Sequence, residues 1–120
     1  MRILSVGCIH GSKAMVEDLA QKAEDEQVDL VILAGDLSSH EGETEGVIGP
    51  FLKKKKKVIF VPGNHDSFAT ADFLAEFYGV KNIHGYSVKY EDVGIFGCSA
   101  VNCGINQISE KETFDLLKQG

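Results

Sequence analysis

The sequence is poor in cysteine, in basic charge and in long apolar runs. Its 3 cysteines are an odd number, which in a chain of 120 residues does not predict a disulfide framework. The 12 Lys and Arg residues are outnumbered by 18 Asp and Glu residues, so a broadly basic surface for nucleic acid is not expected. The apolar stretches are too short for a membrane span or a signal peptide. We therefore predict a cytoplasmic protein with reduced thiols.

Internal repeats, low-complexity tracts and domain linkers are also missing from the sequence. Hydrophobic residues make up 43% of the chain, enough for one domain and too many for wholesale disorder. A capping box at Ser109 and Glu112 predicts a last helix near the end of the sequence. We expect a single α/β domain over residues 1–120.

The first third of the chain reads as strand, helix, strand. Apolar residues fill 3–6, and Ser12 is placed to cap an amphipathic helix of about three turns. Residues 28–34 are a second apolar run, and a helix between two such strands predicts a parallel pair joined by a right-handed crossover.

A third strand is expected at 58–61, where the letters VIFV carry no polar alternation. Such a strand is covered on both faces, as in a parallel sheet. Pro62 and Gly63 end the strand, and the polar residues Asn64, His65 and Asp66 follow at once.

Further along, Thr70 is expected to cap a helix at 71–78. We expect Phe73, Leu74, Phe77 and Tyr78 to face the core on this helix. Alternating residues on both sides of a turn then predict an antiparallel hairpin at 86–98.

A run of lysines, Lys53–Lys57, stands before the third strand. Basic runs suggest nucleic acid, but lysines in a last helical turn also suit the negative end of the helix dipole. Because this run precedes its strand, it should lie at the opposite end of the sheet from Gly63. The run also lacks interleaved aromatic residues, and nucleic acid is the weakest of the functional hypotheses.

Polar side chains follow the ends of all three predicted strands: Cys8 and His10, then Asp36, then Asn64 and His65. Residues two apart in an extended chain share a face, which groups Cys8 with His10. The carboxyl ends of parallel strands lie along one edge, where ligands bind. Thiol, imidazole, carboxylate and amide are metal-ligand types, so a metal site is expected at this edge.

The segments CIHG, AGDL and VPGNHD, in this order and spacing, resemble the D-x-H, G-D and G-N-H-[DE] motifs of the calcineurin-like metallophosphoesterases. The resemblance covers residues 1 to about 98. It implies a partial αββα sandwich, with a parallel βαβ core and an antiparallel hairpin. It further implies two divalent metal ions (Mn, Zn, Fe or Mg) and a phosphomonoester or phosphodiester substrate, attacked by a metal-bound hydroxide.

The resemblance also assigns roles to individual residues. His10 matches a ligand of the first metal, Asp36 the carboxylate that bridges both metals, and Asn64 a ligand of the second. His65 matches the histidine that protonates or orients the leaving-group oxygen, and Asp66 the residue that supports His65.

Two departures from the family pattern leave alternatives open. Cys8 stands where the family has Asp: it is either a thiolate ligand, suited to Zn²⁺ or Fe²⁺, or a small buried residue beside a weakened first site. The later G-H-x-H motif is missing, and the other histidines are His40 and His84. We therefore expect a domain truncated at its C-terminus, or one completed by homodimerisation. The alternative function is a catalytically impaired module of this fold that binds proteins.

Overall fold

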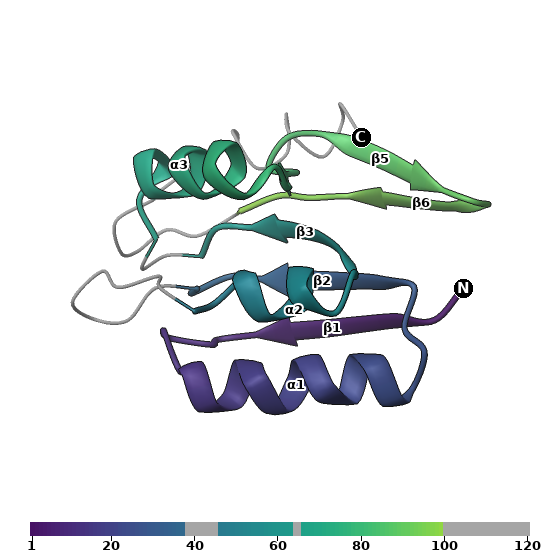
Figure 1. Ribbon diagram of the computed structural model, residues 1–120. Coiled ribbons are helices and arrows are strands. Elements are labelled where there is room, and N and C mark those ends of the chain that lie inside the picture. Colours follow the sequence, from purple (N-terminus) through teal and green to yellow (C-terminus); the bar gives the residue numbers. More distant parts are fainter. Residues whose placement is uncertain (38–45, 64–65, 100–120) are drawn as a thin grey trace.

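The computed structural model describes residues 1–37, 46–63 and 66–99 and alternates strands with helices (Figure 1). The elements are β1 (Ile3–Gly7), α1 (Lys13–Asp25), β2 (Leu30–Ala34), α2 (Gly49–Lys53), β3 (Lys57–Val61), α3 (Phe68–Tyr78), β4 (Lys81–Asn82), β5 (Ser87–Tyr90) and β6 (Val93–Phe96). The predicted helix at 109 and beyond lies outside the described residues.

The first four strands form one parallel sheet in the order β1-β2-β3-β4. Right-handed crossovers between consecutive parallel strands place the helices on one face. The main hydrophobic core is consistent with this arrangement, because residues from all three helices pack with Leu33 of β2 and Phe60 of β3. The predicted parallel βαβ unit is confirmed.

The opposite face of the sheet meets a two-stranded antiparallel sheet made of β5 and β6, as predicted. Leu30, Ile59 and Ile83 are buried there, with Val88 and Ile95 of the hairpin packed against them. Strand β1 is one of the two edge strands of the sheet, and Ile3 on it is 39% exposed. The fold is therefore a mixed α/β arrangement in which the hairpin packs against β2 and β3 and leaves β1 less covered.

The start of α3 differs from the sequence prediction. Ser67, not Thr70, is the N-cap, and its hydroxyl accepts a hydrogen bond from the Thr70 backbone N–H at 3.0 Å. The helix consequently begins at Phe68 rather than at 71.

The expected burial of two aromatic residues on α3 was wrong. Phe73 and Phe77 are 56% and 68% exposed, and their rings stack on each other with centroids 5.4 Å apart. The buried residues of the helix are Ala71 and Leu74. Because eight of the 11 residues of this helix are apolar, the helical period alone did not identify which side faces the core.

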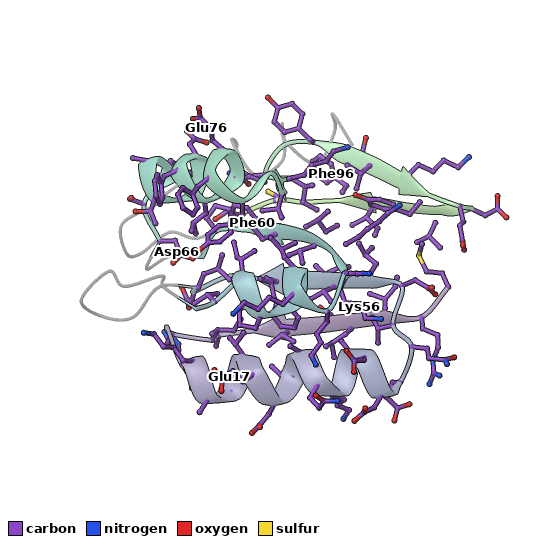
Figure 2. The ribbon with its side chains drawn as sticks, in the orientation of Figure 1. Glu17, Lys56, Phe60, Asp66, Glu76 and Phe96 are labelled. Atoms are coloured by element: carbon purple, nitrogen blue, oxygen red, sulfur yellow. The ribbon has the colours of Figure 1, made fainter. Side chains whose placement is uncertain are left out.

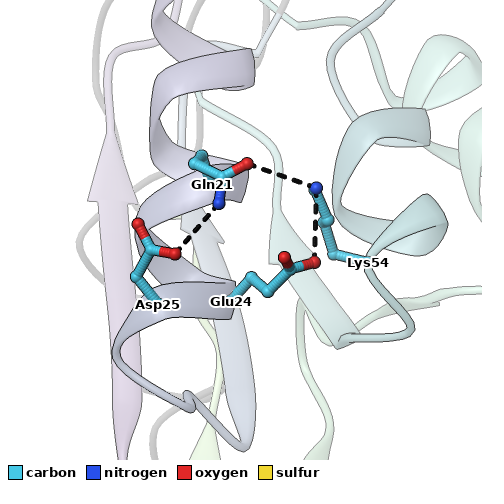
Figure 3. A network of polar contacts seen from close by, with 4 residues as sticks. All are labelled: Gln21, Glu24, Asp25 and Lys54. Carbon is cyan, nitrogen blue, oxygen red and sulfur yellow. Dashed lines mark hydrogen bonds and ion pairs between the residues drawn. The ribbon is translucent and has the colours of Figure 1, made fainter.

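Three residues of the lysine run, Lys54, Lys56 and Lys57, contact other parts of the fold. The Lys54 ammonium lies 3.2 Å from a Glu24 carboxylate oxygen and donates to the Gln21 amide oxygen at 3.3 Å (Figure 3). Gln21 in turn donates to Asp25 at 2.9 Å. This lysine therefore holds α2 against α1.

The following lysines also have structural contacts. Lys56 donates to the Val28 carbonyl at 3.0 Å, and the Lys57 ammonium lies 5.4 Å from the centre of the Tyr90 ring. Figure 2 shows Lys56 and Asp66 toward opposite ends of the sheet, as the position of the run before β3 predicted.

Candidate metal centre

Three predicted ligands meet at the carboxyl ends of β1 and β2. Cys8, His10 and Asp36 each offer one ligand atom, and these atoms all lie within 4.8 Å of one another. The Cys8 sulfur is 3.9 Å from Oδ2 of Asp36. The parallel register pairs Gly7 with Ala34, so the two strands end side by side and deliver these loops to one place.

The backbone at all three positions is left-handed. Cys8, His10 and Asp36 have φ values of 57°, 50° and 43°. The expected grouping of Cys8 with His10 on one face of an extended strand was therefore wrong in its geometry, although the two side chains do converge. A left-handed non-glycine residue costs about 1–2 kcal/mol, and such strain concentrates at functional sites.

Backbone hydrogen bonds hold the first two loops together. The His10 N–H donates to the Asp36 carbonyl at 2.8 Å, and the Gly11 N–H donates to the Leu37 carbonyl at 2.9 Å. The distance between the imidazole and the carboxylate is thus set by main-chain contacts between the two loops.

The loop after β3 approaches Asp36 closely at Gly63, where a larger residue would not fit. A Cβ on Gly63 would overlap the backbone nitrogen and Oδ1 of Asp36 and would lie 2.8 Å from its Cγ. Asp66, only 2% exposed, places Oδ2 at 2.9 Å from both the Gly63 and the Leu37 backbone nitrogens, which donate to it. Sequence reasoning missed this contact with Leu37, because it joins residues 29 positions apart.

The remaining predicted site residues are placed as follows. Asn64, His65 and His40 lie outside the described residues. His84 is described, and it lies beside Ser99 rather than in the cluster of potential metal ligands formed by Cys8, His10 and Asp36.

The donor set fits a divalent metal ion. Thiolate and imidazole suit Zn²⁺ or Fe²⁺, and a carboxylate binds either of them. Cys8 is exposed, so the alternative that it is a small buried residue is wrong. The cluster is also accessible: Cys8 is exposed, and His10 and Asp36 are partly exposed.

A groove of about 390 Å³ opens beside this cluster, between the sheet and the hairpin. Gly35 and Gly63, which adjoin Asp36, form part of its wall. Its other wall residues are mostly apolar and include Ile32, Val61 and Ile95. The volume is within the range of small-molecule sites.

His84 joins β4 to the end of the hairpin. Its Nδ1 accepts a hydrogen bond from the Ser99 backbone N–H at 2.9 Å, so this nitrogen carries no proton. Its ring also lies against Phe68, with centroids 5.4 Å apart. Burial lowers the pKa of His84 from its usual value of 6.5, because the charged imidazolium is poorly solvated there.

We expect His84 to make stability depend on pH. The stabilisation by neutral imidazole is fully present above pH 6.5 and is lost as pH falls through the lowered pKa of the folded state. His84→Asn keeps an oxygen acceptor and does not titrate. Urea unfolding at pH 7 and pH 5 should show the wild type losing more stability than this variant, because only the wild type must protonate a partly buried imidazole. Equal losses would contradict the role of His84.

Comparison with known proteins gives one family. The family model described as "Calcineurin-like phosphoesterase" matches residues 1–119. No curated protein and no solved structure matches the chain. Within the described residues, no helix has the length and apolar character needed to cross a membrane.

Proposed function

This chain belongs to the calcineurin-like phosphoesterase family, and from that premise we propose that it hydrolyses a phosphomonoester or phosphodiester at the cluster of Cys8, His10 and Asp36. The family is one of metal-dependent phosphoesterases. The observation that carries the proposal is the convergence of three ligand types on three strained, left-handed residues at one edge of a parallel sheet.

We assign the metal-holding roles within this site as follows. Cys8 and His10 would hold a first cation, and Asp36 would be shared between this cation and a second one. Asn64 completes the second site; its assignment rests on the GNHD motif, because the residue lies outside the described part of the chain.

A divalent cation held by these residues would supply Lewis-acid chemistry, which stabilises negative charge on phosphoryl oxygens. The chain itself fixes the ligands by the hydrogen bonds between the His10 and Asp36 loops. His65, assigned from the motif alone, delivers a proton to the leaving-group oxygen. The groove beside Gly35 and Gly63 offers space for the organic part of the ester.

Cys8 sets the metal preference in this proposal. A thiolate in place of the family's carboxylate favours Zn²⁺ or Fe²⁺ over Mg²⁺ or Mn²⁺. Soft-metal loading, rather than magnesium, is therefore the condition under which activity should be sought. A cytoplasmic location and a homodimer remain predictions.

The test combines elemental analysis with hydrolysis of an aryl phosphate after addition of Zn²⁺, Fe²⁺ or Mn²⁺. We expect bound metal and turnover in the wild type. Asp36→Ala should reduce both the metal affinity and the hydrolysis rate by on the order of 100-fold or more, because a shared ligand is removed. Asp29→Asn is the control: its carboxylate accepts from the Arg2 backbone N–H at 2.8 Å, before β2 begins. A folded wild type without bound metal or turnover would support the protein-binding alternative instead.

A further inference from the structure

We infer that Asp66 is a positioning residue: its carboxylate sets the spacing of the metal-ligating loops by binding their backbone, without touching the substrate. The inference rests on the proposed function, because it concerns the same metal site. It assigns Asp66 a task beyond the support of His65 that the motif implies.

Asp66 uses a single oxygen to join two loops. Oδ2 accepts from the Gly63 N–H, three residues earlier, and from the Leu37 N–H, in the loop after β2, each at 2.9 Å. The first bond closes the loop that contains Asp66. The second reaches across to the residue that follows Asp36, and therefore ties the loop after β3 to the carboxylate ligand.

The same connection extends to the loop after β1. The Leu37 carbonyl accepts from the Gly11 N–H, and the Asp36 carbonyl accepts from the His10 N–H. A continuous path of hydrogen bonds thus runs from Asp66 through Leu37 to the loop that holds His10. All three strand ends that carry predicted ligands are linked through this path.

The charge and burial of Asp66 suit this task. Asp66 is 2% exposed and Leu37 is 1% exposed, so the Leu37 N–H has little access to water as a replacement for the carboxylate. Hydrogen bonds to an ionised carboxylate are roughly twice as strong as those between neutral groups. Asparagine in its place keeps an oxygen acceptor without the charge, so it should restore the geometry in part, whereas alanine removes the acceptor.

The first experiment measures metal affinity by calorimetry with Zn²⁺ and by the absorption spectrum of bound Co²⁺. We expect Asp66→Ala to weaken Zn²⁺ binding by about 10–100-fold, the range found when groups that orient ligands are removed. Asp66→Asn should recover part of the loss. Asp29→Asn, the carboxylate–amide control before β2, should leave affinity and spectrum unchanged. Wild-type affinity in a folded Asp66→Ala would overturn the inference.

The second experiment needs no metal and separates this inference from the proposed function. Amide hydrogen exchange by NMR on the metal-free protein should show that Asp66→Ala loses protection at Leu37, Gly63 and Gly11 more than at the core strand residue Phe60. Protection that stays at the wild-type level, or falls equally everywhere, would overturn the positioning role. A wild type that takes up no metal would remove the proposed function, while the exchange result would still decide whether Asp66 joins the loops.

Discussion

Gly63→Ala should destabilise the protein by about 3 kcal/mol and abolish high-affinity metal binding, because the added methyl group would clash with Asp36. The new Cβ would overlap the backbone nitrogen and Oδ1 of Asp36, which are parts of the structure that cannot move aside cheaply. Relief requires the loop after β3 to shift away from the loop after β2. That shift would lengthen the Gly63 bond to Asp66 and misplace the Asp36 carboxylate.

Gly94→Ala is the matched control for this substitution. A Cβ at Gly94, on β6, would meet nothing within 4 Å, so this variant should keep metal affinity and nearly all of its stability. Urea unfolding in the presence of a chelator measures the stability change, and Zn²⁺ calorimetry measures the affinity. If Gly63→Ala and Gly94→Ala behaved alike in both assays, the close approach of the two loops would be refuted.

Much of the fold followed from the sequence because its strands are buried on both faces. Strands were predicted at 28–34 and 58–61 from their largely apolar residues, which a covered parallel strand requires. The structure places β2 at Leu30–Ala34 and β3 at Lys57–Val61. The convergence of Cys8, His10 and Asp36 followed as well, since parallel topology alone brings the carboxyl ends of neighbouring strands together.

Three structural details could not be predicted from residue patterns: the helix cap, the backbone conformation at the metal ligands and a contact between distant residues. Ser67 and Thr70 are both good helix caps, and the structure uses Ser67. An extended chain was assumed for Cys8 and His10, but both adopt left-handed backbone, which the sequence gives no means to detect. The bond from Asp66 to Leu37 spans 29 residues, and no periodicity predicts such a contact.

Cys8 is the position where the metal preference of the site can be altered. Cys8→Asp should lower Zn²⁺ affinity relative to Mn²⁺ by on the order of 100-fold, because a hard carboxylate replaces a soft thiolate. Competition titrations with Zn²⁺ and Mn²⁺ on the wild type and this variant measure the change directly. An unaltered ratio would show that the side chain at position 8 does not contact the ion.

Cys8→Gly separates the cost of the strained backbone from the benefit of the thiolate. Cys8 has a φ of 57°, which glycine adopts without strain. The metal-free Cys8→Gly protein should therefore be more stable than the wild type by about 0.5–1 kcal/mol, while its Zn²⁺ affinity falls sharply. Lys55→Gly is the control, because Lys55 has nearly the same φ, 58°, before β3 begins. It should gain similar stability and bind Zn²⁺ like the wild type. Equal Zn²⁺ affinity in both glycine variants would show that the Cys8 side chain does not bind the ion.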